Sequence, residues 1–148
     1  MNRYLAAAAI LCLAFCGTAQ GQECTQVIEG NDLIQFNVQE IRVSADCGEV
    51  TINLRHVGTL PINVMGHNWV LTTTADYIPL AGVAAAAGPP DYLPADDPRV
   101  IATTGMIGGG EETSVTFSLD GLQPGGDYTY FCSFPGHYPL MNGKLIIE

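Results

Sequence analysis

Short segments in which apolar and polar residues alternate dominate the chain after residue 22. In residues 49–55 the alternation places Val50, Ile52 and Leu54 on one face, and residues 114–119 repeat the pattern. Alternation with a period of two in β-branched and aromatic residues predicts half-buried strands. Further strands are predicted at residues 26–29, 40–43, 69–73, 128–131 and 144–147.

Glycine-rich turns separate these strands, and one segment departs from the pattern. Residues 76–88 are rich in alanine, which predicts a short helix inserted between strands and stopped by Pro89 and Pro90. Many short strands with such turns predict an all-β fold, an antiparallel Greek-key sandwich or barrel. Tyr128 follows the turn at Gly125 and is predicted to form the hydroxyl-to-backbone corner of Greek-key sandwiches.

The first 21 residues predict a secretory signal peptide. Arg3 supplies a positive start, residues 5–15 are apolar, and small residues up to Gly21 suit cleavage. The apolar stretch is too short for a membrane-spanning helix. We therefore expect one mature domain at residues 22–148, exported to the periplasm and not held in a membrane.

The chain has five cysteines, of which two lie in the predicted signal peptide. Cys16 leaves open a lipoprotein signal, although Phe15 is larger than the residue that such signals place before the acylated cysteine. Of the other three cysteines, Cys132 lies among candidate metal ligands. Exported proteins usually pair their cysteines, so we predict a disulfide between Cys24 and Cys47, which is worth roughly 3 kcal/mol.

The net charge narrows the choice of partners. The full chain carries a formal charge of −10, and the mature domain, which lacks Arg3, carries −11. Such a surface argues against nucleic acid and anionic membranes as partners and could steer a cationic one. For any single carboxylate, solubility in the exported environment is as good an explanation as steering of a partner.

The segment at residues 132–141 carries the most specific chemistry. It places Cys132, His137 and Met141 within ten residues. A thiolate, an imidazole and a thioether are soft or borderline ligands, which favour copper over calcium or magnesium. A structural zinc site needs four firm ligands, and a thioether is not one of them. The segment therefore predicts a copper site at one end of the sandwich.

A further ligand must come from elsewhere, and His67 is the better of the two remaining histidines. It follows Gly66 where a glycine turn enters a predicted strand, so its ring can project from the end of the sandwich. The Gly66 carbonyl is a candidate distant axial donor. Two imidazoles and one thiolate in a plane, with Met141 as a weak axial ligand, form the blue-copper arrangement. His56 is expected beside the site, where its titration would be coupled to the redox state.

Two stretches of the chain resemble the azurins, bacterial members of the cupredoxin family. Residues 60–71 read Leu-Pro-x-Asn-Val-Met-Gly-His-Asn-Trp-Val-Leu and are similar to the upstream ligand segment of that family. Residues 132–141 have the spacing Cys-x4-His-x3-Met, which separates azurins from other cupredoxins. Cys24 and Cys47 match the family disulfide. The resemblance covers essentially the whole mature chain and implies a cupredoxin-like sandwich with one copper per chain.

The resemblance also implies a role for each site residue. His67, Cys132 and His137 would be equatorial copper ligands. Met141 and the Gly66 carbonyl would be axial.

Other residues would support the site. Asn68 would brace the two ligand segments, and the amides of Asn68 and Phe134 would donate to the Cys132 sulfur. Trp69 would lie in the core. Electrons would pass through the edge of His137, which the family exposes within an apolar patch. The candidates for this patch are Ile34, Leu60, Pro61, Pro139 and Leu140.

We therefore expect a monomeric one-electron carrier, not an enzyme, that exchanges electrons with redox proteins such as c-type cytochromes or nitrite reductase. The alternative is a copper-binding or storage protein, but the chain has no Met-rich or His-rich tract. A copper enzyme of this type would need a second copper site and further domains. Two departures from the family concern partner choice and reduction potential. The mature chain has a single lysine, and Tyr138-Pro139 replaces the small residues common after the second ligand histidine.

Overall fold

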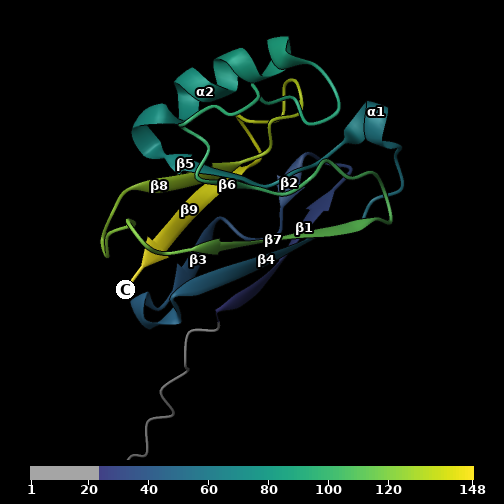
Figure 1. Cartoon of the computed structure of the whole chain (residues 1–148). Coiled ribbons are helices and arrows are strands. Elements are labelled where there is room, and N and C mark those ends of the chain that lie inside the picture. The colour runs from purple at the N-terminus through teal and green to yellow at the C-terminus, as the bar shows by residue number, and fades with distance from the viewer. Residues whose placement is uncertain (1–23) are drawn as a thin grey trace, which may run out of the picture.

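The computed structural model describes residues 24–148, so the predicted signal peptide and Cys16 lie outside the described residues. Two β-sheets face each other in a sandwich (Figure 1). The four-stranded sheet has the order β2 (Gln35–Phe36), β1 (Thr25–Asn31), β4 (Glu49–His56) and β7 (Glu112–Ser118). The five-stranded sheet has the order β3 (Glu40–Val43), β9 (Asn142–Ile147), β8 (Tyr128–Phe131), β5 (Val70–Thr73) and β6 (Ala102–Thr103).

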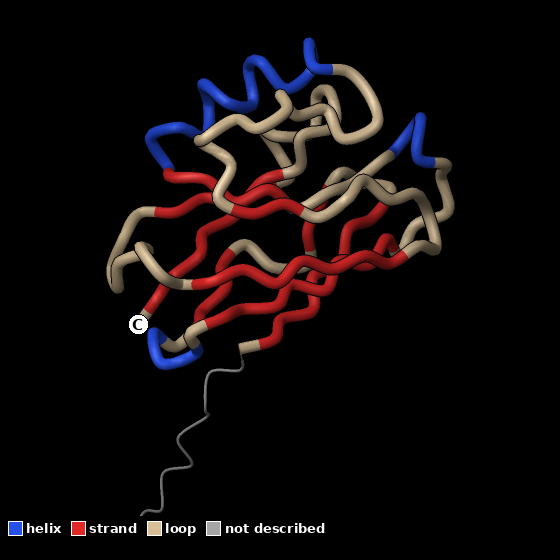
Figure 2. Tube along the Cα trace, in the orientation of Figure 1, coloured by secondary structure: helices blue, strands red, loops and turns tan. Residues whose placement is uncertain are grey.

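The all-β prediction is confirmed, as a sandwich and not as a closed barrel. Every predicted strand is present, while the two-residue strands β2 and β6 were not predicted. Figure 2 shows the strands in two layers with the helices at the periphery. Most strand pairs are antiparallel, as expected, but β1 pairs with β4 and β3 pairs with β9 in parallel. The chain crosses to the other sheet at β3 before β4 returns beside β1, which places both strands in the same direction.

The apolar residues of the alternating strands form the core, as predicted. Val50, Ile52 and Leu54 of β4 are fully buried. Trp69 lies at the centre of the core, where its ring stacks on that of Tyr130 with centroids 5.6 Å apart. Apolar side chains from both sheets therefore close one continuous core between the layers.

The predicted tyrosine corner and the predicted disulfide are both present. The hydroxyl oxygen of Tyr128 accepts a hydrogen bond from the backbone N–H of Gln123 at 2.9 Å. Cys24 and Cys47 are bonded, which ties the start of β1 to a short 3-10 helix, η1 (Ala45–Cys47), just before β4. The far end of the sandwich from the ligand loop is thus fixed covalently.

The alanine-rich insertion forms helix α2 (Thr74–Ala87). It begins two residues before the predicted start, because the Thr73 side chain accepts a hydrogen bond from the backbone N–H of Asp76 and caps the helix. Leu80 and Ala81 are buried against the outer face of the five-stranded sheet, over β5 and β8 (Figure 1). None of the helices in the described part of the chain is long and apolar enough to span a membrane.

Candidate metal centre

The loop between β8 and β9 brings three predicted ligands to one end of the sandwich. Cys132 follows β8 directly, and Met141 directly precedes β9. The backbone N–H of Cys132 donates to the Met141 carbonyl at 3.0 Å, so the loop is closed where the strands leave it. Inside the loop, the N–H of His137 donates to the Phe134 carbonyl at 3.0 Å, and that of Met141 donates to the His137 carbonyl at 2.9 Å.

Three donor atoms converge within this end of the molecule. The Sγ of Cys132 lies 3.8 Å from Nδ1 of His67 and 3.6 Å from Nδ1 of His137. All three donors lie within 4.8 Å of one another, and they form the one such cluster among residues 24–148. Cys132 and His67 are fully buried, and His137 is 3% exposed. The arrangement is a closed site with two imidazoles and one thiol.

His67 is placed by a short helix that the sequence pattern did not predict. Helix α1 (Ile62–Met65) begins after Pro61 and ends at Met65, and Gly66 caps it directly before His67. The backbone of His67 then pairs with Ile107 through two hydrogen bonds of 2.9 Å. Nε2 of His67 lies 2.9 Å from the Asn31 carbonyl oxygen, to which it donates. This bond fixes the tautomer and leaves the Nδ1 lone pair directed at Cys132.

Gly66 allows close packing beside the thiol. A Cβ at this position would lie 2.6 Å from the Ile62 carbonyl oxygen and 3.0 Å from Sδ of Met106. The Gly66 carbonyl oxygen lies 3.7 Å from Sγ of Cys132. The absence of a side chain thus brings this carbonyl to the edge of the donor cluster.

Met141 lies in the same buried space. It is fully buried. A Cβ added at Gly30 in β1 would lie 2.9 Å from Cε of Met141 and 2.8 Å from Cδ2 of His67. The Met141 side chain and the His67 ring therefore share a wall formed by the end of β1.

Asn68 connects the two ligand segments. Its side-chain oxygen accepts from the backbone N–H of Ser133 at 2.9 Å, and its Nδ2 donates to Ser133 Oγ at 2.8 Å. The same Nδ2 lies 3.2 Å from the Asp91 carbonyl oxygen. Asn68 and Ser133 follow His67 and Cys132 directly, so these bonds hold the two donors at a fixed separation.

Burial controls the protonation of the donors. It raises the pKa of the Cys132 thiol to about 12, and hydrogen bonds from the backbone of Asn68 and Phe134 oppose that rise. Burial also lowers the pKa of His67 and of His137 to about 4 in each case. Both imidazoles are therefore neutral at pH 7 with their lone pairs available, whereas the thiol loses its proton only to a cation.

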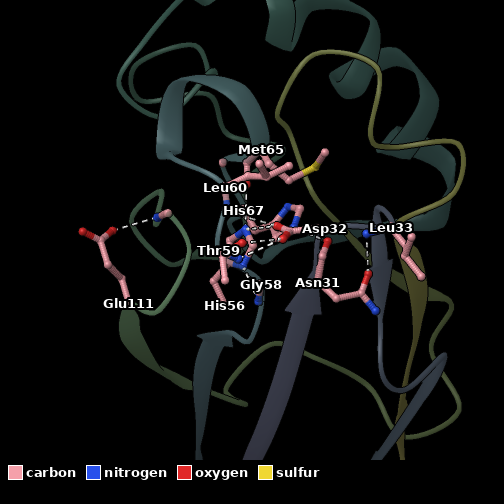
Figure 3. A network of polar contacts seen from close by, with 12 residues as sticks. Asn31, Asp32, Leu33, His56, Gly58, Thr59, Leu60, Met65, His67 and Glu111 are labelled. Atoms are coloured by element: carbon pink, nitrogen blue, oxygen red, sulfur yellow. Dashed lines mark hydrogen bonds and ion pairs between the residues drawn. The ribbon is translucent and has the colours of Figure 1, made fainter.

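His56 lies beside His67 (Figure 3) and does not belong to the donor cluster. Its ring stacks on the His67 ring with centroids 4.3 Å apart. The backbone N–H of Gly58 donates to Nδ1 of His56 at 3.1 Å, and Nε2 lies 2.8 Å from the Met65 carbonyl oxygen. Since Nδ1 accepts, Nε2 carries the proton in this arrangement. The predicted redox-linked titration of His56 stays a prediction.

Comparison with known proteins identifies the family. The family model described as "Copper binding proteins, plastocyanin/azurin family" matches residues 22–148. The chain is 48% identical to azurin of Pseudomonas aeruginosa over 149 residues, which is 100% of each chain. It is 54% identical to azurin-1 of Alcaligenes xylosoxydans xylosoxydans over 83% of this chain and 96% of that one. It is 51% identical to azurin of Bordetella pertussis over 91% of each.

The chain belongs to the plastocyanin/azurin family. As a copper-binding protein it has a donor set that suits the metal. Imidazole nitrogen and cysteine sulfur are ligands that copper accepts, and the three donors face one another in a water-excluding site. The buried Met141 lies near His67, and a thioether is a donor that structural zinc sites do not use. The residues present therefore fit one copper ion.

The five candidate patch residues of this plastocyanin/azurin family member differ in exposure. Leu60 is 37% exposed, Leu140 is 66% exposed, and Pro61 and Pro139 are exposed as well. Ile34 is only partly exposed, because its side chain packs against the core. Its neighbour Leu33 is 72% exposed and shares a surface pocket of about 570 Å³ with Leu140. Leu33 was not among the candidates, and it lies in the same turn as Ile34.

Proposed function

We propose that this protein is a periplasmic one-electron carrier with a single blue copper site. His67, Cys132 and His137 would be the equatorial ligands, and Met141 with the Gly66 carbonyl would be axial. The observation that carries the proposal is the buried cluster of two imidazoles and one thiol within 4.8 Å, in a member of a copper-binding family. Copper bound there would supply a Cu(II)/Cu(I) couple.

The protein supplies a rigid and dry frame for this couple. The donors project from elements held by backbone hydrogen bonds and by Asn68, so their positions are set before the metal binds. Both imidazoles are neutral at pH 7, and Cys132 contributes one negative charge once a cation displaces its proton. A frame that moves little between redox states lowers the cost of reorganisation during electron transfer.

We propose that electrons pass through the edge of His137, between redox proteins and without substrate turnover. His137 lies on the loop that also carries the exposed Pro139 and Leu140. An apolar surface of this kind suits brief encounters, and the charge of −11 on residues 22–148 favours a basic partner. Redox proteins such as c-type cytochromes or nitrite reductase are the expected class of partner.

A storage role is the weaker candidate. Storage requires that copper enters and leaves readily, whereas Cys132, His67 and Met141 are all fully buried. The deciding comparison is between the rate at which a chelator removes copper and the rate of electron exchange with a cytochrome. A carrier exchanges electrons quickly and gives up copper slowly.

Titration of purified copper-free protein with Cu(II) tests the proposal. We expect intense visible absorption from charge transfer between the Cys132 thiolate and copper, which saturates at about one equivalent. Because the pKa of the thiol is about 12, binding at pH 7 should release about one proton per chain, measurable by calorimetry in buffers of different ionisation enthalpy. A pale complex, or saturation without proton release, would contradict the proposal.

Replacement of Met141 by leucine tests the axial assignment. We expect Met141→Leu to keep the visible absorption and to raise the reduction potential, because loss of a weak thioether donor destabilises Cu(II) more than Cu(I). Voltammetry measures the potential. Met106→Leu is the control, since Met106 packs beside Gly66 but outside the proposed ligand set. Equal potentials for both variants would remove Met141 from the proposed site.

A further inference from the structure

Tyr77 connects helix α2 to the loop that carries Cys132 and His137. Its hydroxyl donates a hydrogen bond to the carbonyl oxygen of Tyr138, the residue after His137. Its ring packs against Phe131, the residue before Cys132, with centroids 5.3 Å apart. It also meets the Tyr138 ring edge-on at 6.1 Å. One side chain of the helix thus contacts the sequence neighbours of two proposed ligands.

Helix α2 is itself packed against the sheet. Leu80 and Ala81 are buried in a cluster with Val70 and Phe131, which Tyr77 and Tyr138 also join. In Figure 1, α2 lies over β5 and β8, and β8 leads into the ligand loop. Because α2 is packed on the five-stranded sheet, it holds the Tyr77 side chain against the end of β8.

The Tyr138 carbonyl is held from two sides. Besides the Tyr77 hydroxyl it accepts a hydrogen bond from Nδ2 of Asn142, the first residue of β9, at 2.9 Å. Burial raises the pKa of Tyr77, so its hydroxyl stays protonated and remains a donor at pH 7. Elsewhere the loop is open, since Pro135, Gly136 and Leu140 are exposed. The contact with α2 therefore holds the part of the loop next to His137.

We propose that Tyr77 is a positioning residue that holds the segment from Cys132 to His137 in one place in both redox states. The inference rests on the proposed function, because only an electron carrier gains from a loop that stays still when the charge of its site changes. Asn68 fixes the distance between the two ligand segments, whereas Tyr77 fixes the loop against the helix. The two supports act on different sides of the site.

Tyr77→Phe removes only the hydroxyl and tests the inference. In the copper protein we expect the visible absorption to remain and electron self-exchange, measured by NMR line broadening, to become several times slower. In the copper-free protein we expect the amides of His137, Leu140 and Met141 to exchange hydrogen about fivefold faster, the equivalent of about 1 kcal/mol for one hydrogen bond. Tyr77→Leu, which also removes the ring, should enlarge both effects.

Tyr128→Phe is the matched control, because it removes a hydroxyl that is bonded to the Gln123 backbone, away from the ligand loop. We expect it to lower stability without slowing self-exchange. Wild-type rates for Tyr77→Phe in both measurements, or equal slowing in the control, would overturn the inference. Wild-type protein that stays pale with Cu(II) would contradict the proposed function instead, and amide exchange in the copper-free protein would still test the contact.

Discussion

Replacement of Cys132 by serine is expected to abolish the visible absorption of the copper protein. The absorption needs a thiolate as electron donor to Cu(II), and a serine oxygen is a harder and less reducing ligand. Cys132 is also the one free cysteine among residues 24–148. Absorption spectra of wild type and Cys132→Ser, each with one equivalent of Cu(II), measure the effect directly. Copper binding itself should weaken by orders of magnitude.

The disulfide offers a matched control for the loss of sulfur. Cys24→Ser combined with Cys47→Ser removes two sulfur atoms from the other end of the sandwich. We expect this variant to keep its colour with Cu(II) while its free energy of unfolding falls by about 3 kcal/mol. Strong colour in Cys132→Ser would show that the thiolate of Cys132 is not the donor, and the ligand assignment would then be wrong.

The parts of the fold and site that could be predicted are those encoded locally. Alternation predicted β4 because Val50, Ile52 and Leu54 point into the core and are apolar. The alanine-rich composition after β5 predicted helix α2. Three of the candidate donors lie within ten residues, where a single turn fixes their approach. These features can be read from the sequence because each is set mainly by residues that are close together in the chain.

Long-range contacts explain what the sequence could not predict. The parallel pairing of β1 with β4 depends on where the chain crosses between sheets, and alternation has no direction. Helix α1 has only four residues, too few for a periodic pattern. The contact of Tyr77 with Tyr138 joins positions 61 residues apart. Tyr138 stands out as a departure from the family, but nothing in the sequence points to Tyr77 as its partner.

Acid is expected to destabilise the copper-free protein within a defined pH range. His67 and His137 have folded-state pKa values of about 4, below the value of 6.5 for an unperturbed histidine. Below pH 6.5 the unfolded chain therefore binds more protons than the folded one, so the free energy of unfolding falls as the pH falls. The stabilisation that the two neutral histidines contribute is fully present above about pH 6.5. Below that pH it declines by up to about 1.4 kcal/mol per pH unit for each histidine until the pH reaches the folded pKa.

Urea denaturation of the copper-free protein at pH 7.5, 6, 5 and 4.5 measures this decline, which should total several kcal/mol. His137→Gln removes one of the two groups and should roughly halve the slope. The pKa values of Asp32, Asp97 and Asp127 are lowered from 3.8, so these carboxylates lose their stabilising effect only at lower pH and do not obscure the result. Copper-loaded protein should resist the same acid, because a ligated imidazole nitrogen cannot take up a proton. Equal stability of the copper-free protein at pH 7.5 and 4.5 would mean that the two imidazoles reach solvent and titrate as in an unfolded chain, which would contradict a closed and preformed copper site.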